Sequence, residues 1–199
     1  MLFSKEDLRK LIVPLVIEQL LAVTIGMADT MMVANVGEAA VSGISLVDSL
    51  NILLIQIFSA LATGGAVVAS QYLGRQDREN ACGAAKQLVY ACAAISILVG
   101  GLAMLGGKHL LSLIFGAVEP DVMRNAETYF WLSALSYPAL AIYNAGAALF
   151  RSMSNSRVSM MTSIAMNLVN ISGNAILIYM FNMGVAGAGL ASLVSRILG

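Results

Sequence analysis

Six stretches of predominantly apolar residues, separated by short polar segments, make up this chain. A membrane-spanning helix needs about 20 such residues, and the first five stretches are at least that long. A sixth, shorter stretch starts at residue 185. The pattern predicts helices over residues 11–35, 44–73, 84–105, 126–150 and 158–181. We therefore expect an all-α fold, a polytopic membrane helix bundle of about six transmembrane helices.

Composition agrees with insertion into lipid, because 59% of the residues are hydrophobic, 11% are charged and the mean hydropathy is +0.84. About 25% of the residues of a soluble domain are charged. The formal net charge is zero, so nothing indicates a nucleic-acid partner. Cys82 and Cys92 lack a metal-ligand spacing, and no metal-binding HxxE motif, paired-aspartate signature or nucleophile elbow is present. We expect membrane lipid as a partner, no enzyme activity and no cofactor.

Basic residues in the connecting segments predict the orientation, because cytoplasmic segments of membrane proteins are enriched in Lys and Arg. The segments on one side hold eight of these residues: Lys5, Arg9, Lys10, Arg75, Arg78, Lys86, Arg151 and Arg157. The segments on the opposite side hold only Lys108 and Arg124. The bias predicts a multi-pass protein of the cell (inner) membrane with a cytoplasmic N-terminus.

The first apolar stretch carries two acids, Glu18 and Asp29. At ~100° per residue they lie within roughly 20° of each other around a helix, and about 16 Å apart along it. An ionised carboxylate in hydrocarbon costs a few kcal/mol, so each acid needs a wet cavity, a partner, or a bound proton or cation. A structural acid bonded to a neighbouring helix stays open for both. Pro14, one turn before Glu18, is a predicted hinge of this helix.

Depth brings four polar residues to one level of the membrane. Counted from the predicted helix ends, Asp29, Asn174 and Ser192 lie ~9–11 Å below the same surface, and Asn170 lies about one turn deeper. A carboxylate, two amide oxygens and a hydroxyl form a hard-oxygen set that suits a small cation. Interhelical hydrogen bonding is the structural alternative.

Further polar positions are candidates for the lining of a cavity. Tyr137 and Asn144 share one face of the fourth stretch, and Asn167 continues the stripe that Asn170 and Asn174 form. Glu18 is a candidate because it shares a helix face with Asp29. Asp48, near the start of the second stretch, is interpreted as a wetted helix end. Residues 106–124 are predicted to form the longest polar connection.

Four segments resemble one known family. MADTMMVANVGEAAVSG, VASQYLGRQDRENA, LFRSMSNSRVSMM and GVAGAGLAS are similar, in order and spacing, to segments of the multidrug and toxic compound extrusion (MATE) transporters. The similarity extends over the whole chain. It implies a fold of two six-helix lobes around a central cavity, with residues 1–199 forming most of the N-terminal lobe.

The resemblance also implies a function. Members of this family export cationic or amphipathic compounds in exchange for Na⁺ or H⁺. The resemblance places Asp29 on the coupling aspartate and Pro14 on the proline at which the first helix bends. Asn170, Asn174 and Ser192 fall on positions that line the cation site. Many members have aspartate where this chain has Asn174, so a single Na⁺ or H⁺ would neutralise the one remaining acid.

Two other functions stay open at this stage. A lipid-linked saccharide flippase of the same fold would line its cavity with arginines, and only Arg196 is a candidate here. A non-transporting truncated membrane fragment is the other alternative. The sixth stretch stops at membrane depth, so we expect a missing C-terminal lobe or a second copy of the chain to cover it.

Overall fold

The computed structural model describes residues 5–199, and in this range the regular structure is helical throughout. Short turns connect successive helices, and α5 continues into one turn of π-helix, η1. The elements are α1 (Lys5–Ala34), α2 (Glu38–Gly74), α3 (Arg78–Phe115), α4 (Pro120–Ser152), α5 (Ser156–Asn174), η1 (Ala175–Met180) and α6 (Gly184–Leu198).

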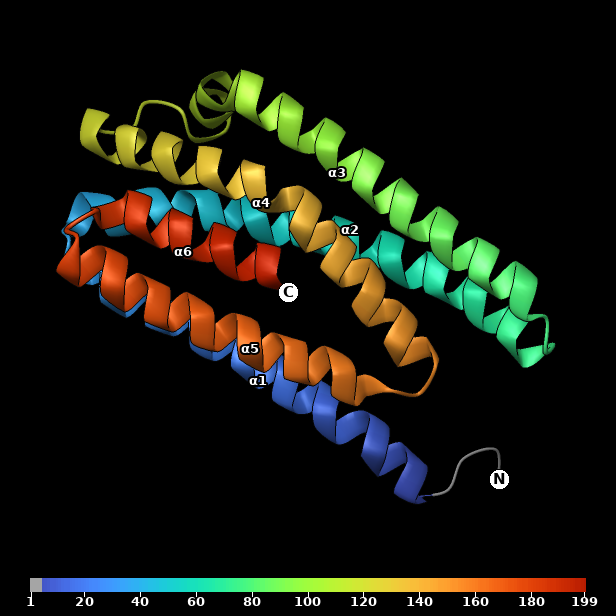
Figure 1. The fold of residues 1–199 in the computed structure, drawn as a ribbon. Coiled ribbons are helices and arrows are strands. Elements are labelled where there is room, and N and C mark those ends of the chain that lie inside the picture. The colour runs from blue at the N-terminus through green and yellow to red at the C-terminus, as the bar shows by residue number, and fades with distance from the viewer. Residues whose placement is uncertain (1–4) are drawn as a thin grey trace.

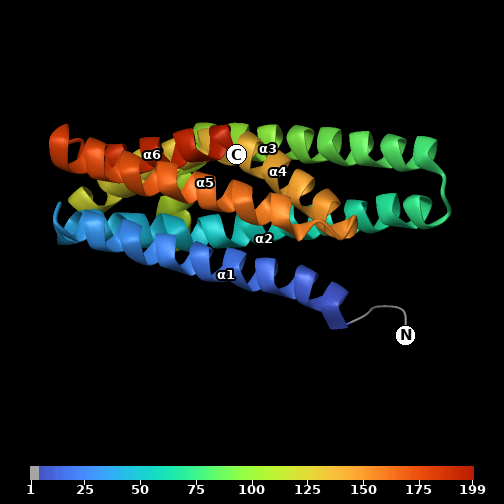
Figure 2. The same ribbon diagram turned by 60° about the horizontal axis from the view of Figure 1, so that its bottom comes forward.

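The helices run up and down in sequence and form one bundle (Figure 1). In Figure 1, α1 lies beside α5 along one side of the bundle, and α2 and α3, which pack against each other, lie toward the other side. Figure 2 shows the turn between α2 and α3 at one end of the bundle and the turn between α5 and α6 at the other end. Helix α4 lies between these pairs and contacts α2, α3, α5 and α6. The six-helix arrangement confirms the fold class that the hydrophobic pattern predicted.

All the helices predicted with two ends begin before their predicted start, and the largest difference at a C-terminal end is at α3. The expectation of a long polar connection over 106–124 was wrong, because α3 continues to Phe115 and only residues 116–119 link it to α4. A helix of 38 residues is ~57 Å long and therefore projects beyond the ~30 Å hydrocarbon layer, and the turn at residues 116–119 marks its C-terminal end. Leu111 is fully buried near this end, and Gly116, with φ +69°, terminates the helix.

Four segments of the described chain are long and apolar enough to cross a membrane: Leu11–Ala34, Glu38–Gly74, Arg78–Phe115 and Ser156–Met180. Helix α4 is of similar length and is the most enclosed helix. It buries the polar side chains of Ser133, Ser136 and Tyr137, and Trp131 and Leu135 are among its exposed apolar residues.

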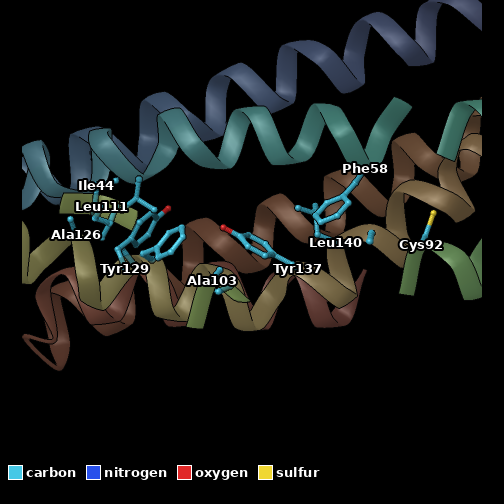
Figure 3. Close-up of a cluster of buried hydrophobic side chains, with 14 of the residues drawn as sticks. Ile44, Phe58, Cys92, Ala103, Leu111, Ala126, Tyr129, Tyr137 and Leu140 are labelled. Atoms are coloured by element: carbon cyan, nitrogen blue, oxygen red, sulfur yellow. The ribbon is translucent and has the colours of Figure 1, made fainter. Parts of the chain in front are cut away.

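The apolar core lies between α2, α3 and α4 (Figure 3). The rings of Phe58 and Tyr137 meet edge to face, with centroids 6.1 Å apart and planes at 61°. Both side chains are at most 1% exposed. This core holds α4 in place and thereby positions the polar residues at its other contacts.

Two glycines let α4 approach its neighbours closely. A Cβ atom on Gly43 of α2 would lie 2.9 Å from the backbone of Val122 and Ala126, and one on Gly100 of α3 would lie 2.9 Å from the carbonyl oxygen of Ala134. Small residues allow such close helix packing in membranes, where dispersion contacts replace much of the hydrophobic effect.

Candidate functional site

Helices α1, α5 and α6 bring Asp29, Asn170, Asn174 and Ser192 together. The amide of Asn174 donates to the carboxylate of Asp29 and to Oδ1 of Asn170, the latter at 3.3 Å. Asn170 in turn donates to Oγ of Ser192 at 3.1 Å. Asn174 is completely buried, Asn170 and Ser192 are 5% and 6% exposed, and Asp29 is partly buried. The four residues form one continuous hydrogen-bonded cluster.

One acceptor in this cluster has no partner. Oδ1 of Asn174 is buried and accepts no hydrogen bond, although its Nδ2 donates twice. A buried oxygen without a partner costs roughly 1–3 kcal/mol, and native proteins rarely leave one without water or an ion. Together with the Asp29 carboxylate, this oxygen supplies hard ligands for a small cation.

Three further ionisable residues lie close enough to Asp29 to interact with it electrostatically: Asp48, Tyr129 and Arg196. The interpretation of Asp48 as a wetted helix end is corrected, because α2 begins at Glu38 and Asp48 lies ten residues inside it, where it accepts a bond from Asn51. Arg196 donates to Ser136 at 2.7 Å. When all three are ionised, two carboxylates and one guanidinium give this neighbourhood a net charge of −1, which a single Na⁺ or H⁺ neutralises.

The backbone changes conformation directly beside the cluster. Helix α5 ends at Asn174, and the next six residues form the π-helix η1. π-Helical turns are rare and occur frequently at functional sites. Tyr179 of this turn accepts a 2.9 Å hydrogen bond from Asn35 just beyond α1, so η1 also ties the end of α1 to the site.

Glu18 has a full set of protein partners. Its carboxylate accepts hydrogen bonds from Tyr143 at 3.2 Å, Arg151 at 3.3 Å and Ser159 at 3.1 Å. The side chains of Glu18 and Arg151 are only 12% and 26% exposed. Glu18 is thus ion-paired and hydrogen-bonded inside the bundle. Pro14 lies inside α1, one turn before it, and is buried.

The other three candidates for a cavity lining are dispersed. Tyr137 points into the α2–α4 core and donates to Asn51 at 2.9 Å, so it packs helices instead of lining a cavity. Asn144 is partly buried, Asn167 is 7% exposed, and the Nδ2 atom of each lacks a partner. A pocket of about 380 Å³ lies between α4, α5 and α6. Its lining includes Tyr143, Ser159 and Arg196, but not Tyr137, Asn144 or Asn167.

Comparison with known proteins identifies sequence relatives over the entire bundle. The MatE family profile matches residues 14–176. The chain is 28% identical over 192 residues to the uncharacterized transporter YisQ of Bacillus subtilis, covering 94% of this chain and 41% of the relative. It is 24% identical to a probable multidrug resistance protein NorM of Thermotoga maritima, covering 98% and 42%. Human multidrug and toxin extrusion protein 1 is 24% identical, with coverages of 96% and 34%.

Solved structures share the fold. An outward-facing multidrug resistance MATE family transporter superposes with a TM-score of 0.91 at 18% identity, over 98% of this chain and 43% of that one. MATE structures in the bent and straight conformations give TM-scores of 0.89 and 0.90, each at 20% identity and over 98% of this chain and 43% of theirs. The chain therefore spans about two fifths of the length of these bacterial relatives and solved structures.

Proposed function

Because this chain belongs to the MatE family, we propose that it forms the N-terminal lobe of a secondary active antiporter that exports cationic or amphipathic compounds in exchange for Na⁺ or H⁺. Relatives named as multidrug resistance and multidrug extrusion proteins support this proposal. The partners that complete it are a second lobe, or a second copy of the chain, and the surrounding lipid.

The contact between Asp29 and Asn174 carries the proposal. It places a carboxylate, with an unpartnered amide oxygen beside it, between three helices of the bundle. A single cation there lowers the cost of the buried negative charge, and a proton does the same by neutralising the acid. In our proposal Asp29 is the coupling acid, and Asn170, Asn174 and Ser192 complete its site.

The proposed cycle is alternating access, in which the ion and the exported compound favour different arrangements of α1. The bent and straight conformations of related MATE structures motivate this assignment, and Pro14 supplies a residue at which α1 can bend. A bound ligand shifts such an equilibrium only by its difference in affinity for the two arrangements. The ion must therefore bind one arrangement of α1 more tightly through Asp29.

Orientation and location are part of the same proposal. The excess of Lys and Arg on one side supports a cytoplasmic N-terminus in the cell (inner) membrane. The α1–α2 and α5–α6 turns then lie on the outer side, and the Asp29 cluster lies in the outer half of the lobe.

The polar neighbourhood of Arg196 argues against the flippase alternative. A cavity for an anionic lipid-linked saccharide needs several cations, whereas Arg196 lies among two acids and donates to Ser136. Arg196 thus serves as a counter-ion to these acids inside the bundle and does not form a binding surface for anions.

Transport by the complete protein in proteoliposomes tests the proposal. An imposed Na⁺ or proton gradient should drive uphill movement of a fluorescent organic cation, and an anionic dye should not move. Gradient-independent movement, or preference for the anionic dye, would contradict it. Residues 1–199 alone should insert into the membrane without transporting, and transport by this chain alone would show that it acts as a dimer.

A further inference from the structure

The buried face of α5 is polar along its whole length. Its six buried residues recur every three or four positions, and none is more than 9% exposed. They are Ser156, Ser159, Ser163, Asn167, Asn170 and Asn174. A helix inside a membrane bundle ordinarily buries small or apolar residues, because polar groups are costly there without partners. We call these six residues the α5 seam.

Helix α1 places one acid near each end of this seam. Glu18 accepts a hydrogen bond from Ser159 at 3.1 Å, and Asp29 accepts one from Asn174. The acids are about 16 Å apart along α1. Helix α1 thus lies along the α5 seam, and both of its carboxylates contact the seam. The apolar residues of α1 face in other directions.

A second observation shows where partners are missing. Among the side chains that the structure describes, four buried nitrogen or oxygen atoms have no hydrogen-bond partner. Three belong to the seam, namely Oγ of Ser156, Nδ2 of Asn167 and Oδ1 of Asn174, and these residues are at most 7% exposed. The fourth is Nδ2 of Asn144 on α4, which packs against α5. Ordered water satisfies many buried polar atoms of native proteins, so we take these four atoms as positions where water binds along the seam. An amide nitrogen only donates, so of the four atoms only Oγ of Ser156 and Oδ1 of Asn174 can also serve as cation ligands.

We infer that the α5 seam is a hydrated cation track that connects Asp29 with Glu18, and that Glu18 is a second station for the coupling ion. Hydroxyl and amide oxygens, with the water between them, replace the hydration shell of a Na⁺ ion and also relay a proton. This inference rests on the proposed function in one respect only, namely that the ion in the track is the coupling ion of the transporter.

The contacts of Glu18 suit a station that an ion passes rather than one that retains it. Arg151 already compensates the carboxylate at 3.3 Å, and Tyr143 and Ser159 donate to it as well. A cation that arrives at Glu18 must compete with the guanidinium, which is tethered and cannot diffuse away. Arg151 therefore limits the dwell time of the ion at this end, and Asp29, with no ion pair within 4 Å in the described chain, holds it at the other.

Reaction of an introduced thiol with Ag⁺, a monovalent cation close in size to Na⁺, tests the track. In the complete transporter with its native cysteines replaced, Ser163→Cys places the thiol midway along the seam, and Ser96→Cys places it in the apolar core. Ser96 is 0% exposed and serves as the matched control, since Ser→Cys changes volume little at either site.

We expect Ser163→Cys to react with Ag⁺ at least about tenfold faster than Ser96→Cys, because a hydrated thiol ionises and a dry one does not. Equal rates at the two positions, whether both slow or both fast, would overturn the track. The outcome is independent of transport. If the Ser163→Cys thiol reacts no faster than the Ser96→Cys thiol while the protein still exports in an ion-coupled manner, the track alone is refuted. If the Ser163→Cys thiol reacts faster but the protein does not export, the proposed function alone is refuted.

The role of Glu18 is tested by charge, with neutral methyl methanethiosulfonate as the comparison reagent on Ser163→Cys. Glu18→Gln should slow the reaction of this thiol with Ag⁺ several-fold, and Arg151→Gln should accelerate it. Neither substitution should change the rate of its reaction with the neutral reagent. If Glu18→Gln changes the reaction rates of both reagents equally, or changes neither rate, then Glu18 only holds α1 against α4 and α5. The proposal of a second station would then be wrong.

Discussion

Asn174 donates its side-chain amide to the carboxylate of Asp29, which joins α5 to α1 across 145 positions of sequence. The same amide holds Asn170, and through it Ser192 of α6. A movement of α1 that displaces Asp29 therefore breaks a bond to α5 at the point where the coupling ion is proposed to bind.

Asn174→Asp should strengthen cation binding. The substitution places a second carboxylate against Asp29, and a site of higher negative charge binds a cation more tightly. We expect at least about a tenfold lower Kd for Na⁺, which corresponds to ~1.4 kcal/mol. Radiolabelled Na⁺ binding to the purified complete transporter measures it. Asn155→Asp, an exposed change of the same kind ahead of α5, is the control and should leave the Kd unaltered.

The α1–α5 contact at Asp29 could be predicted from the sequence, and the surroundings of that contact could not. Helical periodicity and a count of residues from the membrane surface suffice to bring Asp29, Asn174 and Ser192 to one depth. The same count failed for Asp48, because it depends on where a helix begins. Helix α2 starts at Glu38 instead of residue 44, and this moves Asp48 deeper by ~9 Å.

Glu18 shows a second limit of sequence reasoning. Its partner Arg151 lies in the last turn of α4, which ends at Ser152, whereas the hydrophobic pattern assigned Arg151 to a cytoplasmic connection. A long basic side chain can reach an acid inside the bundle from a helix end, and apolar periodicity carries no information about that reach. The polar seam of α5 was seen only in part for a related reason, since serines are common on both buried and exposed helix faces.

The Glu18–Arg151 pair should contribute to stability. Arg151→Gln leaves a mostly buried carboxylate without its cation, and we expect the free energy of unfolding to fall by about 2 kcal/mol, which allows for partial screening by solvent. Arg124→Gln removes a pair with Asp121 whose side chains are 78% and 73% exposed, so it should change stability by less than about 0.5 kcal/mol. Denaturant unfolding in detergent compares the two. If both substitutions change the free energy of unfolding equally, the buried Glu18–Arg151 pair contributes no more to stability than the exposed pair does.

Gly100→Ala should disturb the packing of α3 on α4. The new Cβ atom would lie 2.9 Å from the carbonyl oxygen of Ala134, and overpacking of this kind costs about 1–3 kcal/mol. Gly101→Ala is the matched control, because a Cβ at that position meets nothing within 4 Å. The thermal midpoint should decrease for Gly100→Ala and should be unchanged or higher for Gly101→Ala. The reverse order would contradict the close approach of these helices.

The first turn of α3 should lose protection in acid. Asp77 accepts bonds from the side chain of Asn80 at 2.7 Å and from its backbone N–H at 3.1 Å, and these bonds lower the pKa of Asp77 below its ordinary value of 3.8. The cap is therefore present above that ordinary value and is lost as the pH falls through the depressed pKa. Hydrogen exchange from about pH 5 to about pH 3, corrected for intrinsic rates, should show declining protection near Asn80. Asp77→Asn caps without titrating, so a decline of equal size in this variant would refute the assignment.

Ion exchange upon addition of substrate tests the central claim, that Asp29 holds the coupling ion. In the purified complete transporter, an organic cation should release bound radiolabelled Na⁺ or a proton from the wild-type protein. Asp29→Asn preserves the shape of the side chain and its place beside Asn174, so this variant should fold and bind the organic cation but release neither ion. If Asp29→Asn retains the ion release and ion-coupled export of the wild type, Asp29 is a structural acid and the proposed site is wrong.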